Sequence, residues 1–155
     1  MLRWLAVAAI LVTGCATPYQ EMGFVGGVSA QQMTANTFRI LARGNGYTDG
    51  VTVQDYTMLK AAETTKQVGG THFIVISADD ASRVATFTTP GQAHTTVVGN
   101  TAYTSYSPAQ VHEFFKPGQD AYIRVITVAP GQTAPPGAIA ADEIIQFVGS
   151  RVKRG

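Results

Sequence analysis

The stretch that decides the fold is residues 37–77, TFRILARGNGYTDGVTVQDYTMLKAAETTKQVGGTHFIVIS. Its first part, residues 37–43, alternates Phe38, Ile40 and Ala42 with polar or larger side chains, the period of a β-strand with one buried face. Gly44-Asn45-Gly46 ends that strand. A helix is expected from about Val53 to Val68, with Thr52 as its cap and Asp55 completing a capping box.

A second strand follows this helix. Gly69-Gly70 stops the helix, and His72 to Ser77 is a short apolar run rich in β-branched residues, as in a buried central strand. A strand, a helix and a strand in this order predict a right-handed βαβ unit.

The rest of the chain predicts antiparallel pairing. Ser82 to Thr89 is expected as a strand, and residues 111–116 and 121–128 as a hairpin turning at Pro117-Gly118. A last helix is expected over residues 138–152. The predicted fold is therefore α+β: about five strands in a mixed sheet, βαβ first and antiparallel strands after, with two helices packed on one face. One core is expected to contain Phe38, Ile40, Leu59, Phe73, Val75, Ile123, Val125, Ile145 and Val148.

The segment from Gly91 to Pro108 has unusual composition, being built of Gly, Thr, Ser, Ala and Tyr. Connections of this length are usually functional or disordered. Three interpretations remain open: a β-hairpin turning at Gly99-Asn100, a mobile loop, and a defined binding loop. Tyr103 and Tyr106 are the candidate partner contacts, because exposed tyrosines are common at interfaces.

The N-terminus predicts export. Arg3 precedes an apolar run from Trp4 to Val12, which is too short to cross a bilayer. Val12-Thr13-Gly14-Cys15 then resembles the lipobox of bacterial lipoproteins, in which the cysteine receives lipid and becomes the first residue of the mature chain. The expected division is a signal peptide over residues 1–14, a tether over residues 15–36 and a single α+β domain over residues 37–155. Within the tether, Phe24 and Val25 are expected to pack onto the domain.

Composition excludes several classes of protein. The 155 residues carry 11 Lys+Arg and 10 Asp+Glu without a block of like charge, so no nucleic-acid partner is expected. The single cysteine excludes a disulfide framework within the chain and any multi-cysteine zinc site.

Candidate catalytic residues form only weak patterns. His72, His94 and His112 lack chelating spacing, and no nucleophile elbow accompanies a Ser-His-Asp set. Asp79-Asp80 is expected in a solvated turn, although the pair has the chemistry of an acid and base or of a calcium ligand. Gly44-Asn45-Gly46 is read as turn geometry and not as a phosphate loop. Glu63 is expected to pair with Lys60 or Lys66 on the helix surface.

Several motifs together resemble a family of small proteobacterial lipoproteins. They are Cys15-Ala16-Thr17-Pro18-Tyr19-Gln20, Gly26-Gly27, Gly44-Asn45-Gly46, Asp55-Tyr56 with Leu59 and Ala61-Ala62-Glu63, His72-Phe73, the Thr/Gly/Tyr-rich insert and Phe115-Lys116-Pro117-Gly118. The resemblance implies envelope location and a similar fold, and it implies no substrate.

The expected function is that of a structural or accessory binding module of the cell envelope, without catalysis. Its partners would be the membrane, through lipid on Cys15, and an envelope protein. No cofactor is expected besides the covalent lipid. Ala16 follows the cysteine in place of an aspartate, which by the same resemblance favours the outer membrane facing the periplasm, with the inner membrane or the cell surface as alternatives. An envelope hydrolase using His72 or Asp79-Asp80, and a sensor of a small ligand or metal, are the competing interpretations.

Overall fold

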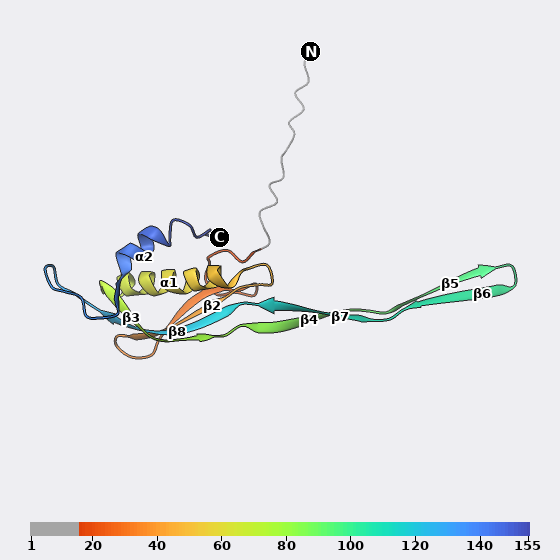
Figure 1. Ribbon diagram of the computed structural model, residues 1–155, viewed down its shortest axis with the longest axis horizontal. Helices are drawn as coiled ribbons and strands as arrows, with labels where there is room; N and C mark the ends of the chain where they lie inside the picture. The colour runs from red at the N-terminus through yellow and green to blue at the C-terminus, as the bar shows by residue number, and fades with distance from the viewer. Residues whose placement is uncertain (1–15) are drawn as a thin grey trace, which may run out of the picture.

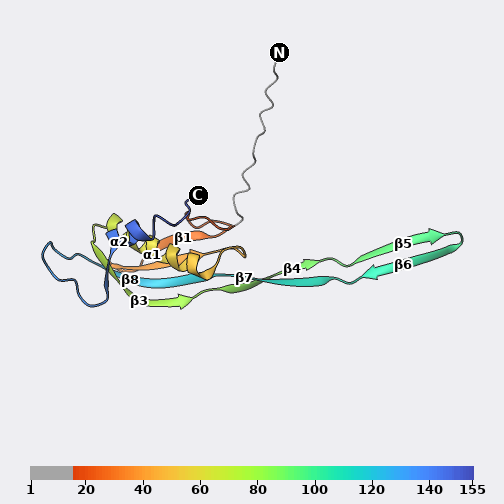
Figure 2. The ribbon, with the colours of Figure 1, turned by 45° about the horizontal axis from the view of Figure 1, so that its top comes forward.

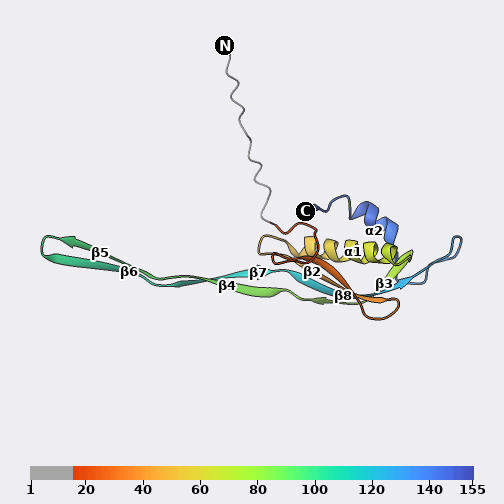
Figure 3. The same ribbon diagram turned by 180° about the vertical axis from the view of Figure 1, so that it is seen from behind.

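The computed structural model describes residues 16–155, which form a body and one long projection. The body combines a sheet with two helices, and the projection is a two-stranded ribbon that leaves the body at one end (Figure 1). The ribbon is separate from the body in the tilted view and from behind (Figures 2 and 3). The predicted signal peptide and Cys15 lie outside the described residues.

Nine strands and two helices make up the described chain. In order they are β1 (Gly27–Gln32), β2 (Thr37–Arg43), α1 (Gly50–Gln67), β3 (His72–Asp80), β4 (Arg83–Thr89), β5 (Gln92–Val98), β6 (Thr101–Ser107), β7 (Gln110–Lys116), β8 (Gly118–Ile126), β9 (Ala138–Ala140) and α2 (Ala141–Phe147).

The sheet of the body has five strands in the order β1-β2-β8-β3-β9, and each neighbouring pair is antiparallel. An α+β fold with about five strands was predicted, but the predicted mixed sheet is wrong. β8 lies between β2 and β3 and pairs with both, so these two strands are not hydrogen-bonded to each other. The sequence pattern reveals strands but not which distant strand enters between them.

The helix α1 begins earlier than predicted. Its cap is Asp49, whose carboxylate accepts a hydrogen bond from the Thr52 backbone N–H at 2.7 Å. The predicted stop is confirmed, because Gly69 adopts φ +82° and its N–H donates to the Lys66 carbonyl. Asp55, predicted to take part in a capping box, instead binds the Arg151 guanidinium through two hydrogen bonds of 2.7 Å.

Two hydrophobic clusters form the core. One contains Phe38, Ile40, Phe73, Ile123 and Val125, and the other contains Leu59 and Val148. Ile144 and Ile145 pack against both clusters, so the predicted single core is two adjoining clusters. Phe73 is fully buried, whereas Val75 is only partly buried and Ile76 is 51% exposed. Burial of β3 thus ends halfway along the strand.

Residues 16–36 are part of the domain and not a tether. β1 pairs with β2 along its whole length, and Thr17, Tyr19 and Val28 are buried. The Thr17 carbonyl accepts a hydrogen bond from the Tyr56 hydroxyl at 2.8 Å. The many Gly and Gln residues suggested a flexible linker. At Gly26, however, the missing side chain allows close backbone packing, because a Cβ there would lie 2.4 Å from the Arg43 carbonyl oxygen.

The predicted hairpin around Pro117-Gly118 is also wrong. β7 pairs with β4, and β8 pairs with β2 and β3, so the chain passes straight through this dipeptide. A type II turn needs a positive φ at the glycine, and Gly118 does not have one. Its missing side chain serves a close approach instead, since a Cβ there would lie 2.6 Å from the Ala81 carbonyl oxygen.

The predicted last helix is shorter than expected. Residues 138–140 add the edge strand β9 to the sheet, and α2 ends at Phe147. A Cβ on Gly149 would lie 2.3 Å from the Ile145 carbonyl oxygen, and this glycine follows the end of the helix.

A charged cluster lies on the face of the sheet opposite the buried side chains of β2. The Asp120 carboxylate contacts Arg39 Nη2 at 2.5 Å and Arg43 Nη2 at 2.6 Å. Burial opposes ionisation of Asp120, but the two guanidinium groups outweigh it and hold the pKa of this carboxyl below its usual value. The ion pairs therefore tie β2 to β8.

Asp120→Asn tests this cluster. At neutral pH the variant should lose roughly 1.5–3 kcal/mol of unfolding free energy, because hydrogen bonds to a charged group are replaced by weaker ones. A carboxyl with a lowered pKa stabilises the fold above its unfolded value of about 3.9, and that stabilisation is lost as the pH falls through the folded value. Urea unfolding of both proteins should show their difference shrinking below about pH 4; a difference independent of pH would contradict the assignment.

Candidate functional site

The outstanding surface of the molecule is the ribbon of residues 83–116, here called the arm. β4 pairs with β7 over seven register positions and β5 pairs with β6 over seven more, up to the turn at Gly99-Asn100. Each pair forms its own two-stranded sheet, so among the described residues no third strand covers either edge. Of the three interpretations of the segment from Gly91 to Pro108, the structure has the hairpin.

The arm exposes many large apolar side chains. Nine valine, phenylalanine and tyrosine residues of the arm remain accessible to solvent: Val84, Phe87, Val97, Val98, Tyr103, Tyr106, Val111, Phe114 and Phe115. Ile76, just before the arm, is exposed as well. The chain carries no Asp, Glu, Lys or Arg from Val84 to His112. Natural proteins usually protect exposed strand edges with charged side chains. Between Val84 and His112 the arm has only Pro90 and Pro108 in this role, at the junctions between its two strand pairs.

Tyr103 and Tyr106 lie on opposite faces of the arm. Both are on β6, where Tyr103 is opposite Thr96 and Tyr106 is opposite Ala93. Residues three apart on a strand point to opposite sides, so one flat partner cannot contact both rings on the same face. The two side chains are 62% and 71% exposed.

The arm is held by backbone pairing and short polar contacts. The Thr95 and Thr104 hydroxyls form a cross-strand hydrogen bond of 2.8 Å. The Ser105 hydroxyl donates to the His94 carbonyl at 3.3 Å. These contacts fix the register of the arm without burying its side chains.

The other candidate residues are not brought together. His72 lies on β3, His94 on β5 and His112 on β7. Asp79 and Asp80 lie in strand β3 and not in a turn, and as successive strand residues they point to opposite faces. No group of three metal-binding side chains occurs within residues 16–155.

The glycine loop and Glu63 have structural partners. The Asn45 N–H donates to the Thr17 hydroxyl at 3.0 Å, so the Gly44-Asn45-Gly46 loop holds the N-terminal segment. Glu63 binds the Tyr19 hydroxyl and Arg154 and not Lys60 or Lys66, which pair with Glu21 and Asp142. Burial and the Glu63 carboxylate raise the pKa of Tyr19 well above its usual value, so this hydroxyl remains a donor.

Sequence reasoning missed a small apolar turn. Phe24 and Val25 were expected to pack onto the domain, but Phe24 is fully exposed and Val25 is 55% exposed. Gly23 and Gly26 flank them, and glycines mark turns and loops, so this spacing was the available signal for an exposed turn.

Comparison with known proteins gave no match: no family model, curated protein or solved structure resembles the chain significantly. Neither helix of the described chain is long and apolar enough to cross a bilayer.

Replacing residues 92–107 with a short Gly-Ser turn tests whether the outer arm is independent of the body. β5 and β6 contact each other and expose every residue, so the melting temperature should stay within a few degrees. Thermal unfolding followed by circular dichroism measures this. Loss of cooperative unfolding would show that the outer arm supports the core.

Proposed function

We propose that this protein is a membrane-anchored binding module of the cell envelope that contacts a partner protein through its arm. The observation that carries the proposal is the arm itself: a two-stranded ribbon with apolar side chains on both faces, open edges and no charge from Val84 to His112. Isolated two-stranded ribbons are only marginally stable in water, and large exposed apolar areas usually mark interaction sites. A partner strand along an open edge would satisfy the edge N–H and C=O groups and cover part of this surface.

The proposed arrangement of the two helices on the sheet gives the arm a rigid base. α1 contacts β1, β2, β3 and β8, and α2 contacts α1 and β9. We infer from these contacts that both helices cover one face of the sheet. β2 and β3 each run antiparallel to β8, so they run parallel to each other and α1 connects them as a βαβ unit with β8 inserted.

Anchoring is proposed at Cys15, where lipid such as palmitate would be attached. The lipobox-like Val12-Thr13-Gly14-Cys15 supports this part, as does the position of Cys15 directly before the folded domain. One acyl chain binds membranes only marginally, whereas several chains on one cysteine anchor firmly. The proposed location is the outer membrane, on its periplasmic side.

Cys15→Ser tests the anchor. The variant should incorporate no labelled palmitate and should leave the membrane fraction, because its hydroxyl cannot accept lipid as the thiol does. The cores are formed by residues after Cys15, so the melting temperature of the domain should not change. Equal palmitate labelling of both proteins would refute lipid attachment at this cysteine.

Photo-crosslinking in intact cells tests the partner. A benzoyl-phenylalanine is placed at Tyr103, at Tyr106 or, as a matched control outside the arm, at Tyr47, which is 77% exposed. An adduct of defined mass is expected from at least one arm position and not from position 47. Because the two arm positions face opposite sides, the stronger adduct identifies the covered face. No adduct from the arm, or the same adduct from all three positions, would overturn the proposal.

A further inference from the structure

The turn at residues 23–26 presents two apolar side chains to solvent in a fixed conformation. The Gly23 N–H donates to the Gly26 carbonyl at 3.0 Å, and the Gly26 N–H donates back to the Gly23 carbonyl at 3.2 Å. Gly26 has φ +112° and packs against the Arg43 carbonyl, so the turn is tied to the end of β2. Phe24 at its tip is fully exposed. An exposed phenylalanine on such a rigid turn is not required by the core.

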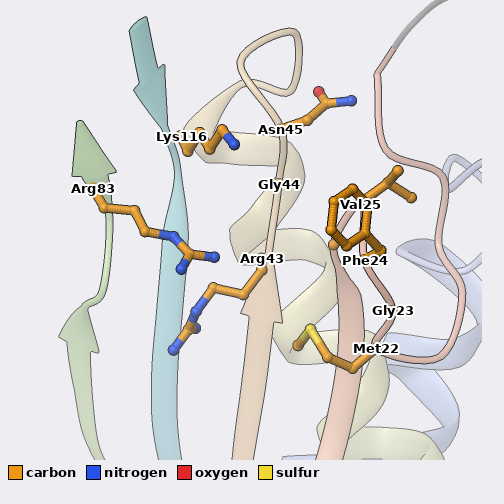
Figure 4. A pocket seen from close by; sticks show the side chains of 10 residues that line it. Met22, Gly23, Phe24, Val25, Arg43, Gly44, Asn45, Arg83 and Lys116 are labelled. Atoms are coloured by element: carbon orange, nitrogen blue, oxygen red, sulfur yellow. The ribbon is translucent and has the colours of Figure 1, made fainter. Parts of the chain in front are cut away.

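Basic side chains face this turn across a pocket of about 220 Å³. Figure 4 shows three apolar side chains on one side and three basic ones on the other: Met22, Phe24 and Val25, and Arg43, Arg83 and Lys116. No acidic residue lines this pocket. Arg43 is already paired with Asp120, which leaves Arg83 and Lys116 to supply the positive charge.

The arrangement of the cations itself indicates an anion. Arg83 and Lys116 are directly opposite each other in the β4–β7 register, at the root of the arm. Like charges at opposite positions destabilise a strand pair. Figure 4 also shows the Arg83 guanidinium directed toward that of Arg43, in a pocket that no acidic side chain lines. An external anion in the pocket would offset this repulsion.

The pocket also lies close to the proposed lipid attachment. The Thr17 hydroxyl donates to the Val25 carbonyl at 3.0 Å and accepts from the Asn45 N–H at 3.0 Å. Thr17 is two residues after Cys15, and two residues span at most about 7 Å. Acyl chains on Cys15 would therefore enter the membrane within a short distance of Phe24.

We propose that Met22, Phe24 and Val25, together with Arg83 and Lys116, form a docking patch for an anionic membrane surface. Phe24 and Val25 enter the interfacial region of the bilayer, and the two basic side chains contact lipid phosphate. The patch rests partly on the proposed anchoring at Cys15, because the anchor holds it at the membrane. The combination of apolar and basic side chains determines the occupant. A free phosphate would leave Phe24 exposed, and an uncharged surface would leave Arg83 and Lys116 without an anionic partner, since among the described residues the Lys116 ammonium contacts only the Phe114 ring, at 5.2 Å.

The test uses the chain from Ala16 to Gly155, which contains both core clusters and can acquire no lipid. Binding to phosphatidylcholine vesicles is compared with binding to vesicles of equal parts phosphatidylcholine and phosphatidylglycerol. Only the anionic vesicles should bind, and added salt should weaken the binding. Failure here would refute the patch alone, since palmitate labelling of Cys15 tests the anchor separately.

Matched variants separate the two halves of the patch. Phe24→Ser should weaken vesicle binding roughly tenfold, and Arg83→Gln and Lys116→Gln roughly fivefold each. The controls Phe147→Ser and Arg124→Gln remove exposed residues outside the patch and should change nothing. Equal effects of Phe24→Ser and Phe147→Ser would overturn the proposal.

Fluorescence gives an independent readout. The only tryptophan of the sequence is Trp4, so Phe24→Trp places the sole indole of the Ala16–Gly155 chain at the turn. Its emission should shift to shorter wavelength with anionic vesicles and stay unchanged with glycerol phosphate. A response to glycerol phosphate that matches the response to vesicles would identify a small-anion site and refute membrane docking.

Discussion

The length of α1 sets the boundary between the body and the arm. Its 18 residues cover about 27 Å of the sheet. Burial along β3 ends at Val75, and from Ile76 on the strand is exposed. β3 and β8 form the pair from which the arm extends, so the arm begins as a continuation of two strands already fixed by the core. Beyond the end of the helix, the arm is held only by backbone pairing and cross-strand contacts.

A second constraint comes from the N-terminal segment, which is attached to three parts of the body. Thr17 bonds to the loop after β2, to the turn at Val25 and to Tyr56 of α1. Tyr19 packs edge-on against Tyr56 and lies beneath the Arg154 guanidinium. These contacts fix the chain from Thr17 on, so an anchor attached two residues earlier would also orient the body. A flexible tether would have no such effect.

Sequence reasoning succeeded where the pattern is local. β2 has its predicted bounds, and the turn at Gly99-Asn100 and the glycine stop of α1 occur where expected. It failed where pairing is distant. Pro117-Gly118 has the composition of a turn, but pairing of β7 with β4 decides its conformation. The linker-like composition of residues 15–36 did not reveal an edge strand with close backbone packing at its glycines. Exposure of Phe24 depends on a turn held by Thr17 and by packing against the Arg43 carbonyl.

The two proposed surfaces lie at opposite ends of the same ribbon. Arg83 and Lys116 form the root of the arm, and the turn at Gly99-Asn100 forms its tip. At about 3.3 Å per residue, the strand residues from Arg83 to Val98 span roughly 50 Å. Lipid contact at the root would therefore leave Tyr103 and Tyr106 accessible, and a partner on the outer arm would not cover the basic side chains. The absence of Asp, Glu, Lys and Arg from Val84 to His112 matches this separation. The proposed lipid contact needs charge only at the root, and the proposed partner contact needs backbone edges and apolar side chains.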